Sequence, residues 1–186
     1  MRVLYIVLLF FISLIVASEQ GVVKMDSFDI EAILEEDKNR QSGTPERYAY
    51  DFNVNINFFD MATTESLDNG DTIWRLHLQS DEAIGMKVYF NQFYLPEGSN
   101  LVIYNNKYNM IEGPFTSENN HDDGEFSHAL IKGSILTLEY FQSANSIGSP
   151  MLNISNVYHA YKDILDFYES GRDRNCGENV ACDDGE

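Results

Sequence analysis

The sequence predicts a mainly β protein, an antiparallel β-sandwich of jelly-roll type with one short helix near its N-terminus. Three observations support this prediction. Between residues 48 and 164, apolar and polar residues alternate in short runs, which is the period of half-buried strands. Turn-forming residues such as Asn69-Gly70 separate these runs at short intervals. The apolar helical period occurs only in a short stretch before residue 48.

The first 18 residues are arranged like a secretory signal peptide. Arg2 gives a positive start, and an apolar run from Val3 to Val16, interrupted only by Ser13, is followed by small residues. The run is shorter than the ~20 apolar residues of a membrane-spanning helix, so cleavage is favoured over a retained membrane anchor. We therefore expect a secreted or periplasmic protein that has no membrane contact once the signal is removed.

Residues 19–47 are expected to form a helical N-terminal segment. In the stretch DSFDIEAILEEDKNR, either Asp26 or Ser27 can cap a short helix. Its apolar residues Ile30, Ile33 and Leu34 would share one face. The glycine and proline of QSGTPE follow and should end this helix.

Residues 48–164 are expected to form the sandwich itself, with eight or nine short strands. Trp74 is in phase with Leu76 and Leu78 and should be a core residue, whereas His77 is out of phase and should face solvent. His159 lies among aromatic residues, against which it should pack. The expected strands are AYDFNVNINFF, TIWRLHLQ, AIGMKVYF, two strands around the turn in FYLPEGSNLVIYN, NMIEGPF ended by its Gly-Pro, FSHALIK, SILTLEYF and MLNISNVYHAY.

Composition and motifs limit the chemistry of the chain. Its formal net charge is −18, from 12 Lys+Arg and 30 Asp+Glu, so it should repel phosphate backbones and have no nucleic-acid partner. The sequence has no G-x-S-x-G elbow, no H-E-x-x-H, no P-loop and no G-x-G-x-x-G. We therefore assign no catalytic residue and no cofactor to this chain, although it can belong to a larger enzyme.

The polar stretch ENNHDDGE offers oxygen ligands of the kind that calcium takes. The candidates are Asn119, Asn120, Asp122, Asp123 and Glu125. The spacing of an EF-hand is not met, because no glutamate stands at the twelfth position counted from the first of these residues. A solvated hairpin loop is therefore favoured over a calcium site.

The two cysteines of the chain, Cys176 and Cys182, have five residues between them. Export makes them candidates for disulfide bonds. A structural zinc site is disfavoured, because it needs four ligands and no histidine lies near this pair. Whether they bond to each other or to other cysteines is not decided by their spacing.

Four stretches, taken together in their order along the chain, resemble a known family. They are IWRLHLQSDEAIGMKVYFNQFYLPEGSNLVIYN, IEGPFTSENN, GEFSHALIKGSILTLEYF and ISNVYHAY. In order and spacing they resemble the N-terminal region of bacterial lysyl endopeptidase-like secreted serine proteases. The terminal stretch GRDRNCGENVACDDGE is similar to the motif S-G-x-C-N-x-x-V-x-C-P-E-G, near which the mature protease begins in that family.

The resemblance implies a non-catalytic pro-region that assists folding of its own downstream protease domain, inhibits it, or does both. It implies that residues 165–186 are a linker and the start of a truncated protease domain, and that Cys176 and Cys182 pair with cysteines of the missing part. Family members cut after a lysine, but the nearest preceding lysine is Lys162, and Arg172 and Arg174 lie closer to the motif. We therefore expect processing at these arginines.

The alternative function is a self-contained secreted β-sandwich that binds carbohydrate or a cell surface. It predicts that Cys176 and Cys182 bond to each other.

Overall fold

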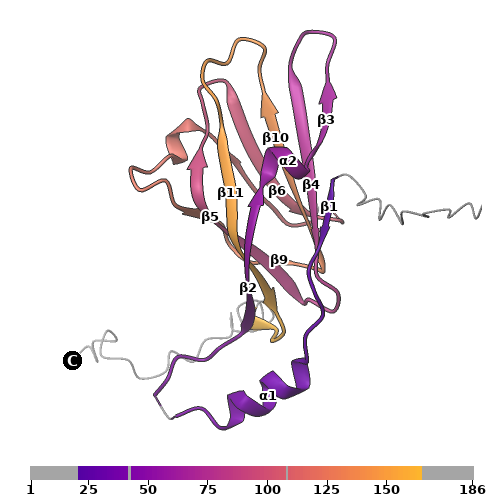
Figure 1. The fold of residues 1–186 in the computed structure, drawn as a ribbon, viewed down its shortest axis with the longest axis vertical. Helices are drawn as coiled ribbons and strands as arrows, with labels where there is room; N and C mark the ends of the chain where they lie inside the picture. Colours follow the sequence, from indigo (N-terminus) through magenta and orange to yellow (C-terminus); the bar gives the residue numbers. More distant parts are fainter. Residues whose placement is uncertain (1–20, 42, 108, 165–186) are drawn as a thin grey trace, which may run out of the picture.

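The computed structural model describes residues 21–41, 43–107 and 109–164. In this part of the chain two β-sheets pack face to face, and the predicted mainly β sandwich is confirmed (Figure 1). One sheet has the order β1 (Val22–Lys24), β4 (Thr72–Gln79), β10 (Ile135–Gln142), β6 (Ser99–Asn105) and β7 (Ile111–Phe115), with β3 (Thr63–Ser66) also on β4. The other has the order β2 (Ala49–Asn57), β11 (Met151–Ala160), β5 (Gly85–Tyr94) and β8 (Phe126–Ser127), with β9 (Ile131–Lys132) also on β5.

The strand pairs are nested, as in a jelly roll. In antiparallel pairs β2 lies beside β11, β4 beside β10, β5 beside β8 and β6 beside β7. Each pair lies inside the previous one along the chain, and successive pairs alternate between the two sheets. This arrangement is the double Greek key that the predicted fold class requires.

The core lies between the two sheets and is made by the apolar phase of each strand. Leu76 and Leu78 from β4 and Val88 and Phe90 from β5 are fully buried. Trp74 is partly buried and packs against this core, as predicted. His77 lies on the outer face of its sheet, where it is half-buried and its Nδ1 is 2.8 Å from the hydroxyl of Thr137.

The N-terminal segment differs from the prediction in two respects. It begins with β1, which pairs with β4 in parallel and was not expected. The helix α1 (Ile30–Lys38) is present, but its N-cap is Asp29, whose side chain accepts a hydrogen bond from the backbone N–H of Ala32 at 3.0 Å. Asp26 and Ser27 lie too far before the helix to serve this first turn.

Some predicted strand boundaries were also wrong. The two runs AIGMKVYF and FY form one strand, β5, which continues through a register shift opposite β11. The strand β7 runs through Gly113-Pro114 instead of ending there. The expected strand FSHALIK is two separate two-residue strands, β8 and β9. The short helix α2 (Phe58–Met61) follows β2 directly and takes up the end of the expected strand AYDFNVNINFF.

Among the described residues, no helix has the length and apolar character needed to cross a membrane.

Candidate functional site

One end of the sandwich joins three distant parts of the chain. Figure 1 shows α1 beyond this end, near the start of β2 and the end of β11. The backbone carbonyl of Tyr48, just before β2, accepts hydrogen bonds from the N–H groups of Tyr161 at 3.1 Å and Lys162 at 3.3 Å. The chain therefore leaves the last strand along a path that the beginning of β2 fixes.

Side chains reinforce this junction around a single carboxylate. Asp37, on α1, accepts hydrogen bonds from Arg47 Nε at 2.9 Å and from the Tyr161 hydroxyl at 2.8 Å, and it pairs with Lys162 Nζ at 2.9 Å. Only 7% of the Asp37 side chain is exposed. We call these four residues, Asp37, Arg47, Tyr161 and Lys162, the exit clamp. Outer acidic side chains extend it: Glu36 pairs with Arg47 at 3.0 Å, and Glu46 pairs with Lys162 at 3.1 Å.

The electrostatics of the exit clamp favour the charged form of its carboxylate. Desolvation raises the pKa of Asp37, but hydrogen bonds from Lys162, Tyr161 and Arg47 outweigh it and lower the pKa to about 2. The hydrogen bond to Asp37 raises the pKa of Lys162 in return. The clamp is therefore a charged cross-link at neutral pH, and its groups supply no nucleophile or proton carrier near pH 7.

Sequence reasoning did not find the exit clamp. Its central contact joins residues 124 positions apart, Asp37 and Tyr161. The helix that carries Asp37 was expected, but no local pattern indicates which of its acidic residues turns towards the sandwich.

A serine and a histidine meet inside the sandwich, but they are closed off from solvent. Ser80 Oγ lies 2.7 Å from His159 Nδ1, and the two residues are 2% and 1% exposed. The ring of Phe28 packs edge-on against His159 at 4.8 Å between centroids, which confirms the expected aromatic packing. His159 Nε2 has no hydrogen-bond partner among the described residues, so no third group orients the ring, and burial lowers its pKa. This pair is therefore a packing contact and lacks the geometry of an activated nucleophile.

A second buried histidine, His128, was not singled out from the sequence. It is 5% exposed, and its Nε2 accepts a hydrogen bond from the backbone N–H of Val88 at 3.1 Å. Burial lowers the pKa of His128 to about 4, so the ring is neutral at physiological pH. It secures a short bridge beside β5 and is unavailable for acid–base chemistry.

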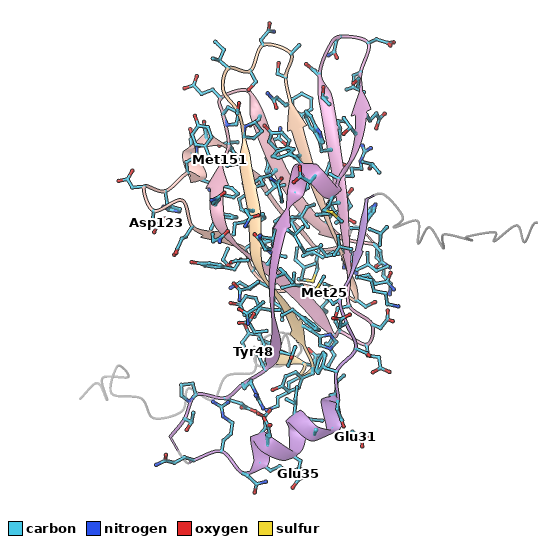
Figure 2. All side chains as sticks on the ribbon, in the orientation of Figure 1. Met25, Glu31, Glu35, Tyr48, Asp123 and Met151 are labelled. Carbon is cyan, nitrogen blue, oxygen red and sulfur yellow. The ribbon has the colours of Figure 1, made fainter. Side chains whose placement is uncertain are left out.

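The stretch weighed as a calcium site and expected to be a hairpin loop is instead a crossover between the two sheets, because it connects β7 to β8. The tip of this loop, marked by Asp123, projects away from the sandwich in Figure 2. Asn119 accepts a hydrogen bond from the backbone N–H of Thr116 at 2.9 Å, and Asn120 bonds both backbone groups of Leu95 at 2.8 and 2.9 Å. Asp123 accepts from the N–H of Glu125 at 2.9 Å. Within the described ranges, no group of three or more His, Cys, Asp or Glu side chains is placed to hold a metal ion.

The remaining predicted sites, Cys176, Cys182, Arg172 and Arg174, lie outside the described residues, as do the signal peptide of residues 1–18 and most of the linker of residues 165–186. Comparison with known proteins finds no matching family model, no matching curated protein and no matching solved structure.

Proposed function

We propose that this chain is the non-catalytic pro-region of a secreted, lysyl endopeptidase-like serine protease precursor. In this role it assists folding of the downstream protease domain, inhibits that domain, or does both. The resemblance of four ordered stretches is the starting point of the proposal, and a β-sandwich of one domain is compatible with it.

The exit clamp is the observation that carries the proposal. The clamp fixes Tyr161 and Lys162 immediately before the expected linker, so the chain that follows starts from a defined position. Tethering one end of a following chain to a folded body reduces the conformations open to it. Such a restraint helps a protease of trypsin type, whose β-barrels depend on contacts between distant residues and fold slowly.

The clamp also supports the choice of processing site. A trypsin-like protease must take the basic side chain at the cut into its specificity pocket, but the Lys162 ammonium is held by Asp37 and Glu46 and its side chain is only 24% exposed. Cleavage there would require the clamp to open. Processing at Arg172 or Arg174 would leave the clamp intact, so we keep these residues as the proposed targets.

Reading the gene beyond the codon for Glu186 tests the proposal most directly. We expect a continuous frame that encodes further cysteines and spaced His, Asp and Gly-Asp-Ser-Gly residues. A stop codon at that point would refute it. Mass spectrometry of the secreted enzyme tests the processing step separately: residues 151–176 should be found cut within 165–175, and an active enzyme in which they remain continuous would contradict that step.

Thiol titration of the chain tests the cysteine pairing. Unfolded without reductant, the chain should give two free thiols if Cys176 and Cys182 need partners from the downstream domain. A bond between the two would instead support the alternative of a self-contained binding module.

A further inference from the structure

The outer face of the five-stranded sheet carries an unusual concentration of amide side chains. Asparagine is depleted in β-strands, because its side chain competes for local backbone hydrogen bonds. Tyr48 and Met151 mark the two ends of this sheet (Figure 2). We define the amide face by the residues that β2, β11 and β5 present on it: Asn53, Asn55, Asn91, Asn153 and Asn156, with Tyr89 and Tyr158.

Three of these amides form an ordered row across the strands. Asn153 Nδ2, on the central strand β11, donates to Asn55 Oδ1 at 3.0 Å and to Asn91 Oδ1 at 2.9 Å. The side chains of Asn55 and Asn91 make no other hydrogen bond with the described residues, so both keep their amide N–H donors, and Asn153 keeps its side-chain carbonyl oxygen. The row therefore offers donor, acceptor and donor at successive strand spacings of about 4.8 Å.

A second row lies nearer the exit clamp and includes the two tyrosines. Asn156 Nδ2 donates to Asp51 Oδ1 at 2.8 Å and to Asn53 Oδ1 at 3.4 Å. Tyr89 stands directly opposite Asn156 in the ladder, and Tyr158 stands opposite Asp51. A hydrogen bond to Glu125 raises the pKa of Tyr89 to about 12, so this hydroxyl stays protonated. The amide pairs and tyrosine rings are thus held in place before any ligand arrives.

The strands of the amide face carry few charged side chains for a protein of net charge −18. The three strands β2, β11 and β5 contain Asp51 and Lys87, and no other Asp, Glu, Lys or Arg. The carboxylates of Glu125 and Asp123 lie near Tyr89 at the β5 side of the face, so an anionic ligand would be repelled there. Apart from Asp51 and Lys87, the groups that the three strands present are neutral amides and hydroxyls. The core of a protein interface is usually enriched in aromatic residues, Met and Arg, and of these the amide face has only its two tyrosines.

We propose that the amide face binds a neutral polysaccharide, lying across β2, β11 and β5. Amide groups present a donor and an acceptor in one plane, which matches adjacent sugar hydroxyls, and tyrosine rings offer flat apolar surface to sugar C–H groups. The site is an open sheet face, which suits a chain of several sugars. The proposal does not rest on the proposed pro-region function, and it assigns residues to the carbohydrate-binding alternative.

Affinity electrophoresis of the full chain tests this proposal. Native gels would contain a soluble uncharged polysaccharide, either galactomannan, hydroxyethylcellulose or a β-1,3-glucan, with the polyanion alginate as a comparison. The uncharged gels should retard the chain, and alginate should not. Asn91→Ala and Tyr89→Ala should each weaken binding about 3- to 10-fold, since each removes one hydrogen-bonding or ring contact.

Matched variants separate binding from folding. Asn100→Ala removes an amide from the outer face of the other sheet, on β6, and should leave retardation unchanged. Tyr89→Phe keeps the ring and should retain most of the affinity, and thermal unfolding should show that every variant folds. No retardation by any of the three uncharged polysaccharides would overturn the proposal, as would retardation that is unchanged in Asn91→Ala and Tyr89→Ala. If the face serves only to dock the protease domain, none of the three uncharged polysaccharides should retard the chain.

Discussion

Replacing Asp37 by alanine removes the carboxylate shared by the exit clamp. Arg47, Lys162 and the Tyr161 hydroxyl would lose a partner at 2.8–2.9 Å. Exposed ion pairs contribute about 0.2–1 kcal/mol, and breaking a buried pair costs about 3–5 kcal/mol. Asp37 is nearly buried, but 33% of the Arg47 side chain and 24% of the Lys162 side chain are exposed. We therefore expect a loss of about 1–2 kcal/mol, between the values for exposed and buried pairs.

The pKa of Asp37 gives an independent limit on this figure. Its reduction from 3.8 to about 2 corresponds to at most about 2 kcal/mol, and solvent screening at the rim of the molecule reduces this towards about 1 kcal/mol. The folded-state pKa lies below the unfolded value. The contribution is therefore complete above about pH 4 and is lost as the pH falls from about 4 to about 2.

Thermal unfolding of the full chain, followed by circular dichroism, measures the effect. A loss of about 1–2 kcal/mol should lower Tm by roughly 2–8 °C for a domain of this size. A lysine-specific protease should also cut after Lys162 faster, by up to about 30-fold if the opening is local. Asp81→Ala is the control, because it removes the exposed pair of Asp81 with Lys24 at 2.7 Å and should change Tm by about 1–2 °C or less. If Asp37→Ala behaved like this control in both assays, the clamp would not hold the exit of the chain.

Three further predictions concern the sandwich. Acidification from about pH 6.5 to pH 4 should lower the free energy of unfolding by up to about 3 kcal/mol through His128. The folded-state pKa of His128, about 4, lies below the unfolded value, so the unfolded chain binds more protons in this range. In urea titrations, the free energy of unfolding should change less with pH for His128→Gln than for the unchanged protein, and an equal change would contradict this. Phe90→Ala should cost about 3–5 kcal/mol in the same titrations, since Phe90 is fully buried, and a loss below about 1 kcal/mol would mean that the core is not packed as described. Gly113→Ala should cost about 2–4 kcal/mol, because φ is +104° and a Cβ would lie 2.7 Å from the Leu101 carbonyl oxygen. Gly124→Ala should cost only about 1–2 kcal/mol, because φ is +69° but no atom lies within 4 Å of the added Cβ. Equal losses for the two variants would contradict the steric argument.

The strands of the sandwich were predictable where one face of the strand is exposed to solvent and the other faces the core. TIWRLHLQ and AYDFNVNIN show that alternation, and both are strands, whereas the two phenylalanines expected to end the second strand lie in α2. The strand β3 has the sequence TTES and is exposed throughout, so no alternation of apolar and polar residues predicts it. The bridges β8 and β9 have two residues each, which is too short for any period to appear.

The functional surfaces were less predictable than the strands. The asparagines of β2 were visible as its polar phase, but their meaning depends on Asn153, which lies 98 residues from Asn55 and 62 from Asn91. The exit clamp likewise depends on contacts that exist only once α1 lies against the residues that precede β2 and follow β11. Local patterns record which face of a strand is polar, and only the strand order shows which polar residues become neighbours.

The nested pairing of strands has a consequence for the biogenesis of this protein. In the five-stranded sheet β11 lies between β2 and β5. These two strands are synthesised early, but neither can form its pairing with β11 until β11 has been made. A nascent chain shorter than about 150 residues would have both of these edges bare, and bare edges recruit other chains. Closure of the sandwich is therefore timed by the emergence of its final strand, and any domain encoded after it would begin to appear just as its neighbour becomes complete.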